Sequence, residues 1–413
     1  MKKSLRVGII GGGIGGVALA RALWQRGISF QLFEQAAEFR EVGAGIQMTP
    51  NAVKVLKSLG LENEIQQVGF LPEAMVGRSW ETGEELFRTP LKDTFVRLFG
   101  AAYYHVHRAD LHSILAEGLP EECITFNVKC VNVQLREDKA VAVFDNGDEF
   151  EGDLIVGADG IRSVVRGALW GKDAPTFTGH MCWRALVPVD KHPLPFVLPA
   201  ATFWFGPKAH VVTYYVKGGS AVNIVACKET DEWVKESWTE PSSTEELLKA
   251  YDGWHSDLIR LFERTDNSLV FKWGLYDRNP MERWSRGHAT LLGDAAHPML
   301  PYLSQGAAMA IEDAYVLSEA LVYFGGNVTL ALDAYEAERR NRTRDVQLQS
   351  RERGRTYHLD SPEEQRRRDL AIRERQTRNP HAVGISAEWV YEYDATTCRQ
   401  RFGVSSSVSM KEL

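Results

Sequence analysis

Residues 6–34 constrain the fold of this chain more than any other stretch, because a strand, a glycine turn, a helix and a second strand follow one another there. The segment reads RVGIIGGGIGGVALARALWQRGISFQLFE. Its first apolar run is short and β-branched, as in a buried parallel strand, and helix formers follow the turn. Gly11, Gly13 and Gly16 have the spacing G-x-G-x-x-G, and Glu34 ends the second strand.

Each of these features suits a dinucleotide. Gly11 allows a tight turn, Gly13 lets the backbone approach a pyrophosphate, and Gly16 lets helix and strand pack closely. The free N–H groups at the start of the helix attract phosphate. Glu34 can accept hydrogen bonds from ribose hydroxyls, and its charge disfavours a 2′-phosphate. Glycine turns also occur for structural reasons alone, but the complete order of elements predicts a dinucleotide site.

The composition excludes several classes of protein. The chain has 413 residues, of which 44% are hydrophobic and 25% charged, as is ordinary for a globular protein of two or three domains. A net charge of -7 argues against nucleic-acid binding, and no apolar run is long enough to span a membrane. The five cysteines show no metal-binding spacing, so we expect no metal site and free thiols in a reducing cytoplasm: Cys123, Cys130, Cys182, Cys227 and Cys398.

Two later segments repeat the strand–turn–helix form. In DLIVGADGIRSVVRGAL, a buried strand leads into a turn at Asp159 and Gly160, whose amides could meet a phosphate or a ribose. In ATLLGDAAHPMLPYLSQGAAMA, a short strand ends before Asp294. A loop then leads to Gln305 and Gly306, where a long helix dense in small residues begins, with its positive end facing whatever lies beside it.

The segments between them are less specific. Residues 125–150 alternate apolar and polar positions around an Asp-Asn-Gly turn, which predicts a β-meander. Asn51 is expected to cap a helix after a glycine loop. Arg108 precedes a helix that begins near Asp110, and the residues alone leave open whether it is a surface charge or an anion contact.

The pattern predicts an α/β fold with four ranges. A Rossmann-like nucleotide-binding domain is expected over 1–178, which includes the meander, and again over 273–330. Between them, at 179–272, clustered aromatic and β-branched residues predict an inserted, mostly antiparallel β-sheet domain that covers the substrate. The region 331–413 is predicted to be helical, and its mixed Arg and Glu residues are expected to form solvated helix faces.

Three segments, GGGIGG near the start, GADG at 157–160 and GDAAHP at 293–298, together resemble the single-component FAD-dependent aromatic hydroxylases. This family has the p-hydroxybenzoate hydroxylase fold and includes salicylate hydroxylase, 3-hydroxybenzoate 6-hydroxylase and 6-hydroxynicotinate 3-monooxygenase. The resemblance spans nearly the whole chain. It implies FAD as cofactor, NADH or NADPH as co-substrate and a cytoplasmic enzyme, with a homodimer expected. It also implies hydroxylation of a phenolic aromatic acid through a flavin C4a-hydroperoxide.

The resemblance assigns cofactor-binding roles residue by residue. Gly11, Gly13, Gly16 and Glu34 would bind the ADP half of FAD, and Val42 to Gly45 would lie beside a mobile flavin. His297, within the GDAAHP loop, is expected to be structural rather than catalytic. The remaining implied FAD contacts are Arg108, Asp159, Gly160, Asp294, Pro298, Gln305 and Gly306.

His210 and Tyr214 are the candidate catalytic residues. They lie four positions apart in KAHVVTYYV, so in a strand they share one face. The resemblance places them at the substrate phenol, with His210 as proton acceptor and Tyr214 as its partner on the oxygen. Without it, a satisfied sheet histidine and an aromatic core stripe would explain the same residues. The further substrate-pocket candidates are Gln47, Tyr103, Arg184 and Tyr302.

The substrate itself stays open at this point. Relatives that act on hydroxypyridine acids tend to carry His where this chain has Gln47 and Tyr302, and the 3-hydroxybenzoate enzymes tend to carry Gln at Pro301. Arg184 is a candidate clamp for a carboxylate. Alternatives are a hydroxylase of a hydroxylated N-heteroaromatic acid, an FAD oxidase, or a flavin-binding protein without oxygenase activity.

Overall fold

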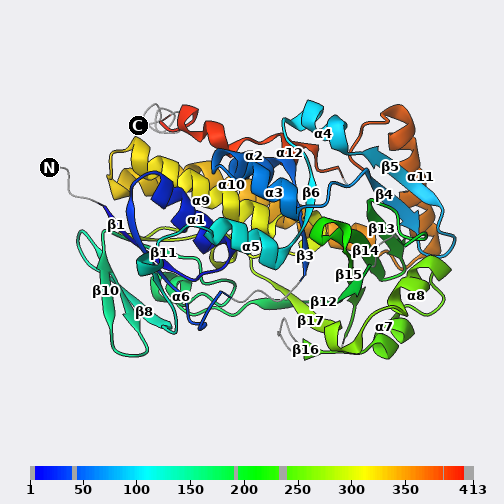
Figure 1. The fold of residues 1–413 in the computed structure, drawn as a ribbon, viewed down its shortest axis with the longest axis horizontal. Coiled ribbons are helices and arrows are strands. Elements are labelled where there is room, and N and C mark those ends of the chain that lie inside the picture. Colours follow the sequence, from blue (N-terminus) through cyan, green and yellow to red (C-terminus); the bar gives the residue numbers. More distant parts are fainter. Residues whose placement is uncertain (1–4, 40–43, 190–193, 232–239, 385, 404–413) are drawn as a thin grey trace.

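The opening stretch folds as its residue pattern predicts. A computed structural model describes residues 5–39, 44–189, 194–231, 240–384 and 386–403 of the chain. The first apolar run forms β1 (Arg6–Ile10), the helix formers make α1 (Ile14–Gln25), and the next apolar run forms β2 (Ser29–Phe33). β1 and α1 lie at the left of Figure 1. β1 and β2 pair in parallel, as a strand–helix–strand unit requires.

A five-stranded parallel sheet grows from this unit, in the order β18–β11–β1–β2–β7. Parallel strands end at one edge of their sheet, so the turns that follow β1, β2, β11 and β18 meet there. The predicted meander is confirmed as a separate antiparallel sheet in the order β10–β9–β8. The bounds are β7 Ile124–Thr125, β8 Cys130–Leu135, β9 Ala140–Phe144, β10 Glu149–Gly152, β11 Leu154–Gly157 and β18 Ala289–Leu291.

The helices beside the parallel sheet pack closely against one another. α1 packs against α5 (Arg108–Ala116) and α9 (Gly306–Tyr323). A Cβ added to Gly15 would lie 2.6 Å from Leu292 and 3.2 Å from Ala310, so α1 and α9 approach more closely than larger residues would allow. Most of α9 is buried. The run of small residues in this helix therefore serves close packing.

The second sheet has eight strands in the order β16–β17–β12–β15–β14–β13–β4–β5. Adjacent strands of this sheet pair in antiparallel fashion, except for the parallel pair β13–β4. This agrees with the prediction of a mostly antiparallel sheet. β4 and β5 join it from outside the range 179–272, and the four-range division of the chain stays a prediction. The bounds are β4 Ala74–Ser79, β5 Glu85–Pro90, β12 Thr176–Pro188, β13 Ala201–Gly206, β14 Ala209–Val216, β15 Ala221–Glu229, β16 Glu240–Pro241 and β17 Phe271–Asp277.

The two faces of this sheet have different neighbours. On β14, Val211 and Tyr215 belong to a core shared with α7 (Thr244–Ala250) and α8 (Ser256–Phe262). Val212 and Tyr214 belong instead to the core that also contains β1, α1 and α9. Successive side chains of a strand alternate between faces, so His210 also points toward the nucleotide-binding half. The sheet thus presents one face to helices and the other to the predicted cofactor.

A two-stranded sheet and short helices lie between the halves. β3 (Gly45–Met48) pairs with β6 (Tyr104–His107), and the helices are α2 (Pro50–Ser58), α3 (Glu62–Val68) and α4 (Lys92–Phe99). The expectation that Asn51 caps a helix is wrong. α2 begins at Pro50 with Thr49 at the N-cap position, because proline suits the first turn of a helix. Asn51 is fully buried and bonds elsewhere.

The helix α6 (Val164–Trp170) lies between β11 and β12. The C-terminal region is helical, as predicted. It holds α10 (Val328–Tyr357), α11 (Pro362–Arg378) and α12 (Glu388–Glu392), and α11 lies beside β5 at the right of Figure 1. The expectation of a solvated charged face is correct for Arg344 but wrong for Arg339, which has no exposed surface. One face of α10 is buried along its length, and Arg339 lies on it.

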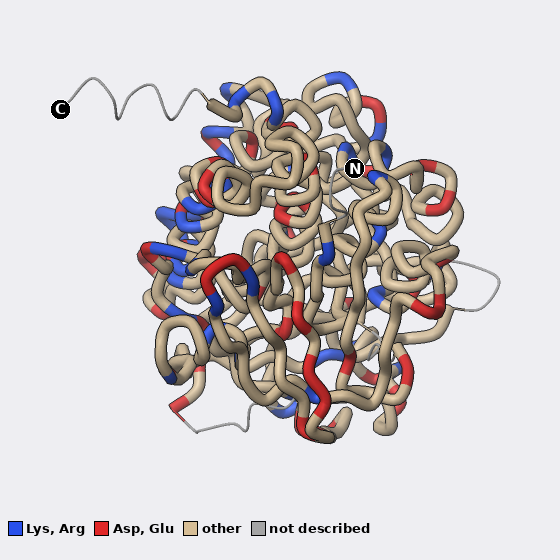
Figure 2. Tube along the Cα trace, turned by 90° about the vertical axis from the view of Figure 1, so that its left-hand side faces the viewer, with Lys and Arg blue, Asp and Glu red and all other residues tan. Residues whose placement is uncertain are grey.

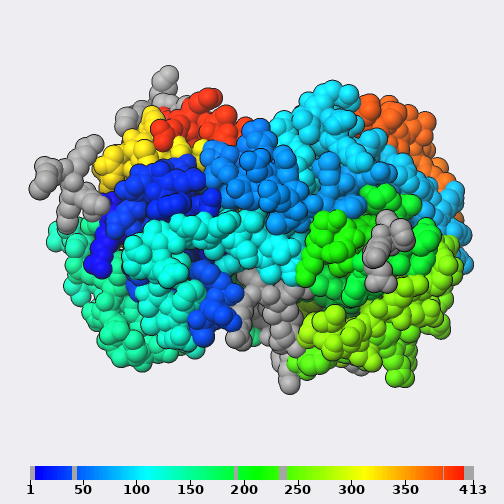
Figure 3. Space-filling model, viewed as in Figure 1, coloured from blue at the N-terminus to red at the C-terminus, as the bar shows by residue number. Residues whose placement is uncertain are grey.

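Figure 2 shows Lys and Arg residues as well as Asp and Glu residues in several separate parts of the chain. Figure 3 shows the two halves as filled surfaces, with the blue and teal segments at the left and the green and orange segments at the right. Among the described residues, no helix is both long and apolar enough to cross a membrane.

The expectation of five free thiols is wrong. Cys182 on β12 and Cys227 on β15 are direct partners in register, with Cα atoms 4.1 Å apart, and they form a disulfide. Cys123, Cys130 and Cys398 are free. The pairing could not be read from the sequence, since 45 positions separate the two cysteines and only the sheet register places them side by side.

A thiol count tests this disulfide. In denaturant without reductant, we expect a thiol reagent to label the three free cysteines, and all five after reduction. Mass spectrometry of the peptides identifies which ones react. The variant Cys182→Ala should show four reactive thiols in both conditions, because Cys227 loses its partner. Five labelled cysteines in the unreduced protein would show that the bond does not form.

Candidate active site

The residues predicted to bind a nucleotide meet at one edge of the parallel sheet. Gly11 follows β1, Glu34 follows β2, Asp159 follows β11 and Asp294 lies just beyond β18. The start of α9 joins them, since a Cβ added to Gly306 would lie 4.0 Å from Asp294 Oδ1. Ligands of open α/β sheets bind at the carboxyl ends of the strands. The fold therefore gathers residues that are far apart in the chain into one candidate site.

The glycines of the first turn differ in what they permit. Gly11 has a φ of +105°, and a Cβ there would lie 2.5 Å from the carbonyl oxygen of Ala158. A Cβ on Gly16 would lie 1.9 Å from the oxygen of Gly11. Packing within the protein thus requires glycine at both positions. At Gly13, by contrast, a Cβ would meet no protein atom within 4 Å, so the open side of the turn is free for a ligand.

Glu34 is held in place at the end of β2. Its carboxylate accepts hydrogen bonds from Gly12 N at 2.7 Å and Ala36 N at 2.8 Å. His112 Nε2 bonds the carbonyl of Gly12 at 2.6 Å, so this histidine supports the turn. Each carboxylate oxygen has a second lone pair, and Glu34 can still accept from ribose hydroxyls.

Asp159 anchors the start of α6. It accepts hydrogen bonds from Ser163 Oγ at 2.5 Å, Val164 N at 2.7 Å and Val165 N at 3.2 Å. Burial raises the pKa of Asp159, and these hydrogen bonds oppose the rise. Arg166, on the same helix, donates to the carbonyls of residues 295 and 296. The turn after β11 is therefore tied to the turn after β18.

Asp294 and Arg108 lie within electrostatic reach of each other. Burial raises the pKa of Asp294, and the charges of His297 and Arg108 oppose the rise. Asp294 nevertheless remains exposed to solvent on one side, although protein atoms surround most of its carboxylate. Arg108 is thus placed at the inner edge of the sheet, beside an acid, rather than out in solvent.

A buried charge network fixes the turn after β18. Asp313 on α9 contacts His297 Nε2 at 2.6 Å and Arg339 Nε at 2.7 Å, and accepts from Gly293 N at 3.1 Å. Arg339 also reaches Glu312 at 2.5 Å. Burial alone would raise the pKa of Asp313, but His297 and Arg339 hold it below its ordinary value. His297 is thus a structural anchor, as expected.

The same network fixes the start of α9. Asn51 Nδ2 donates to Glu312 Oε1 at 2.6 Å and to Gln305 Oε1 at 3.0 Å. Gln305 Nε2 donates to Thr49 Oγ1 at 3.0 Å. All four residues are buried. Gln305 therefore holds the helix start by its side chain, which leaves the backbone of Gly306 beside Asp294.

His210 faces the loop that leads from β18 to α9. Its ring centroid lies 5.2 Å from that of Tyr302, in this loop, and 5.1 Å from that of Tyr357 on α10. His210 Nδ1 and His358 Nε2 are hydrogen-bonded at 2.7 Å. Burial lowers the pKa of His210 to about 3, with the charge of His180 adding to the effect. His210 is therefore a neutral, buried imidazole.

Tyr214 faces β3 and β6. Its ring lies 4.5 Å from the ring of His105, and a Cβ on Gly45 would lie 2.6 Å from it. Asn223, opposite Tyr214 in register, accepts a hydrogen bond from Gly45 N at 2.8 Å. Burial raises the pKa of Tyr214, and the nearby charge of Arg184 opposes the rise. Gly45 thus packs on the substrate-side sheet.

Two buried amide NH2 groups in this region have no hydrogen-bond partner among the described residues. Tyr103 donates to Gln47 Oε1 at 2.7 Å, and burial raises the pKa of Tyr103 well above its ordinary value. Among the described residues, Gln47 Nε2 and Asn223 Nδ2 make no hydrogen bond although both are buried. Buried polar groups are normally paired, so these N–H groups mark a place where a polar ligand fits.

Neighbouring contacts link the pocket candidates to the catalytic candidates: Gln47 bonds Tyr103, Tyr103 and Tyr214 both pack on His105, Arg184 acts on Tyr214, and Tyr302 packs on His210. Pro298 lies in the connecting loop, where its carbonyl accepts from Gln347 Nε2 at 2.8 Å. Gly160 has a φ of +76° and an open side. Val42 and Gly43 lie outside the described residues. Sequence reasoning missed Asn223, His105, His358, Arg166 and Arg339, although an asparagine inside the apolar strand SAVNIVACK is a readable signal.

A separate cavity of about 300 Å³ lies between α10, α11 and β13. Its lining includes Phe205, Tyr357, Arg353, Arg368 and Arg375. It lies away from the nucleotide edge of the parallel sheet. The candidate active site is instead defined by the glycine turn, the amide NH2 groups of Gln47 and Asn223, and the face of β14 that carries His210 and Tyr214.

Comparison with known proteins assigns the family. The chain belongs to the FAD binding domain family, whose model matches residues 4–350. It is 39% identical to 3-amino-4-hydroxybenzoate 2-monooxygenase PtnB3 of Streptomyces platensis, over 96% of this chain and 98% of that protein. It is 38% identical to 6-hydroxynicotinate 3-monooxygenase of Pseudomonas fluorescens, over 84% and 90%. Among solved structures, a salicylate hydroxylase substrate complex is 26% identical with a TM-score of 0.79, over 97% and 98%.

The residues at the sheet edge fit FAD, the cofactor of this family. The open side of Gly13 offers space for a pyrophosphate beside the uncapped N-terminus of α1. Glu34, at the end of β2, keeps acceptor lone pairs that would suit ribose hydroxyls. Further polar groups come from the turn after β18 and its neighbours, namely Asp294, Arg108 and the start of α9. The family and the similar solved structure confirm the p-hydroxybenzoate hydroxylase-like fold and FAD as cofactor, and the individual FAD contacts stay predictions.

Replacing Gly13 with Ala tests the nucleotide edge. The added methyl group meets no protein atom within 4 Å, so the fold should be kept, but it occupies the approach to the pyrophosphate. We expect FAD affinity to fall about 10- to 100-fold, the equivalent of one lost charge-assisted hydrogen bond. Fluorescence of released flavin measures it. Gly167→Ala, whose methyl group would have its nearest neighbour at 4.0 Å, is the control, and equal flavin retention in both variants would disprove the assignment.

Arg339→Leu tests the buried network. The change leaves Glu312 and Asp313 buried without this partner, which costs about 3–5 kcal/mol of the free energy of unfolding. The start of α9 should loosen as well, so FAD should be retained less. Chemical denaturation and flavin content measure the two effects. Arg344→Leu, on the exposed side of the same helix, should cost at most about 1 kcal/mol. Equal stability of the two variants would show that the network is dispensable.

Proposed function

We propose that this chain is an FAD-dependent monooxygenase that uses NAD(P)H and O2 to hydroxylate a phenolic aromatic acid. The observation that carries the proposal is that His210 and Tyr214 share one face of β14 in a chain of this family, with His210 against Tyr302 of the loop between β18 and α9 and Tyr214 against His105 of β6. In the balanced overall reaction, NAD(P)H, a proton, O2 and the aromatic acid are converted to NAD(P)+, water and the hydroxylated acid. A cytoplasmic location and a homodimer stay predictions.

In this proposal the sheet edge holds FAD. Gly11, Gly13, Gly16 and Glu34 would bind its ADP half, and the other predicted contacts would line its remaining length. When bound, FAD supplies the redox chemistry: it takes reducing equivalents from NAD(P)H and delivers one oxygen atom of O2 to an electron-rich ring. The residues that we assign to that remaining length are Gly45, Arg108, Asp159, Gly160, Asp294, Pro298, Gln305 and Gly306.

The chain's own chemistry is the activation of the substrate phenol. A phenol becomes more electron-rich as it loses its proton, and a neutral imidazole can take that proton. His210 is neutral and buried, and its Nδ1 is engaged with His358, which leaves Nε2 for the substrate. This role requires His210 to donate its Nδ1 proton to His358 Nε2. Tyr214, kept protonated by burial, donates to the same substrate oxygen.

Arg184 is the proposed partner of the substrate carboxylate. It lies close enough to Tyr214 for its charge to affect that phenol, and it stacks over Trp273 at 4.2 Å. The names of both curated relatives describe aromatic acids with a ring hydroxyl, which supports this substrate class. The 38% identity to a 6-hydroxynicotinate enzyme favours a hydroxylated N-heteroaromatic acid as the second candidate. Gln47, Tyr103 and Tyr302 would complete the pocket.

A substrate panel tests the proposal. The acids are salicylate, 3-hydroxybenzoate, 4-hydroxybenzoate, 3-amino-4-hydroxybenzoate and 6-hydroxynicotinate, each with NADH and with NADPH. One acid should stimulate NAD(P)H oxidation and oxygen uptake with little peroxide, and its product gives the ring position. Oxygen uptake with an acid but no NAD(P)H would indicate an oxidase instead. Bound flavin with no stimulation by any acid would favour a flavin-binding protein.

His210→Ala and Tyr214→Phe test the catalytic pair. FAD binding should be kept, because neither residue belongs to the nucleotide edge. Hydroxylation should fall about 10²- to 10⁴-fold in His210→Ala, the range for loss of a general base, while NAD(P)H oxidation turns to peroxide. The controls are His381→Ala and Tyr323→Phe, both at exposed positions. Normal coupling in His210→Ala would remove this residue from the mechanism.

A further inference from the structure

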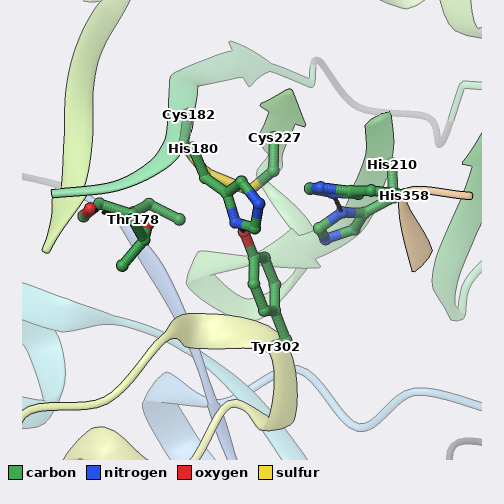
Figure 4. Close-up of a disulfide and its surroundings, with 8 residues drawn as sticks. Thr178, His180, Cys182, His210, Cys227, Tyr302 and His358 are labelled. Atoms are coloured by element: carbon green, nitrogen blue, oxygen red, sulfur yellow. Dashed lines mark hydrogen bonds between the residues drawn. A yellow bond between two sulfur atoms is a disulfide. The ribbon is translucent and has the colours of Figure 1, made fainter. Parts of the chain in front are cut away.

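A second cluster of polar residues lies beside the disulfide. His180 on β12 and Glu229 on β15 are direct partners in register, two positions from the bonded pair Cys182–Cys227 and on the same face. His358, at the C-terminal end of α10, completes the cluster. Figure 4 shows His180 next to the disulfide and His358 beside His210.

Three side-chain atoms of this cluster converge. His180 Nε2 lies 3.9 Å from Glu229 Oε1, and His358 Nδ1 lies 3.8 Å from the same oxygen. All three atoms lie within 4.8 Å of one another. His358 is buried, and among the described residues its Nδ1 makes no hydrogen bond. Buried polar groups are normally paired, so a buried nitrogen 3.8 Å from a carboxylate oxygen and without a hydrogen bond is a suitable donor atom for a cation.

The other nitrogen of each imidazole has a hydrogen-bond partner. His180 Nδ1 bonds the hydroxyl of Tyr302 at 2.6 Å, and His358 Nε2 bonds His210 Nδ1 at 2.7 Å. These contacts are drawn in Figure 4. Both partners can accept a hydrogen bond from the imidazole N–H, so His180 Nε2 and His358 Nδ1 can each present a lone pair. Imidazoles that bind metals almost always donate their other N–H in this way.

We propose that His180 Nε2, His358 Nδ1 and Glu229 Oε1 bind one divalent cation of the zinc type. Two imidazoles and one carboxylate, with water as the fourth ligand, form a known donor set for Zn²⁺. Bonds of about 2.1 Å at tetrahedral angles place ligand atoms about 3.4 Å apart. The two nitrogen–oxygen distances, 3.9 and 3.8 Å, are close to this value, and the side chains would have to draw together to bind the ion. The expectation of no metal rested on motif spacing, and these ligands come from three separate segments.

The surroundings let a cation enter and stay. The side chain of Glu229 is 37% exposed, so the site opens to the surface on that side. The charges of Asp231 and Asp360 act on Glu229, and Lys208, which opposes them, is paired with Asp360 at 3.2 Å. The disulfide joins the two strands that carry His180 and Glu229. It therefore limits how far these two ligands can move apart.

Metal binding would also affect His210, and this consequence rests on the proposed function. When a cation occupies His358 Nδ1, the proton of that ring is on Nε2. His358 Nε2 then donates the hydrogen bond to His210 Nδ1. The neutral His210 then carries its own proton on Nε2 and cannot accept one there from a phenol. Zn²⁺ bound at this site should therefore inhibit hydroxylation.

Equilibrium dialysis of the full, FAD-loaded chain against Zn²⁺ tests the site. The protein is first freed of metal with a chelator, and bound zinc is counted by elemental mass spectrometry. We expect one strongly bound zinc per chain. Glu229→Gln and His358→Gln should each weaken this binding about 100-fold or more, since even loss of a supporting residue costs 10- to 100-fold. Binding should weaken as pH falls, because protons compete for the imidazoles.

Matched controls and a second measurement keep the outcomes separate. Glu263→Gln and His381→Gln, both exposed, should bind zinc like the unaltered chain. FAD content and circular dichroism show whether each variant is folded. If His358→Gln does not fold, Glu229→Gln still tests the site, because residue 229 is only half-buried. No stoichiometric zinc, or equal zinc in folded ligand variants and controls, would overturn the site. Zinc binding without inhibition would leave the site intact and overturn only its coupling to His210.

Discussion

A buried ion-pair network between α9 and α10 holds the turn after β18 and the start of α9, two parts of the predicted cofactor edge. Arg339 on α10 contacts both Glu312 and Asp313 on α9, and all three lack solvent exposure. Charges out of water are tolerated only when each is paired and hydrogen-bonded. The side chains that satisfy them, His297 and Asn51, lie next to the turn after β18 and the start of α9. Geometry at the cofactor edge therefore depends on a network that itself touches no ligand.

The loop between β18 and α9 links the two halves of the site. Its first part carries Asp294 at the nucleotide edge, and its second part carries Tyr302, whose ring lies against His210 on the other sheet. Tyr302 also bonds His180, beside the disulfide. A single segment thus relates the position of the FAD edge to that of the substrate face and of the proposed cation site.

Much of the fold was predictable because its signals are local. The strand, glycine turn and helix of residues 6–34, the β-meander and the long helix of small residues follow from neighbouring side chains, and the structure confirms them. Failures came where distant contacts decide. Asn51 resembles a helix cap, but Glu312 and Gln305 hold it inside α2. Arg339 resembles a solvated charge, but it is buried because two carboxylates of another helix face it.

By itself, the sequence determined the family, the cofactor class and the strands that carry the main motifs, since glycine spacing and apolar periodicity act over a few residues. Only the tertiary structure decided which distant residues meet. It bonded Cys182 to Cys227, placed His180 opposite Glu229, and set His358 against His210. The physical reason is that sheet register and helix docking are fixed by burial of whole faces, which depends on many residues at once rather than on the spacing of a few.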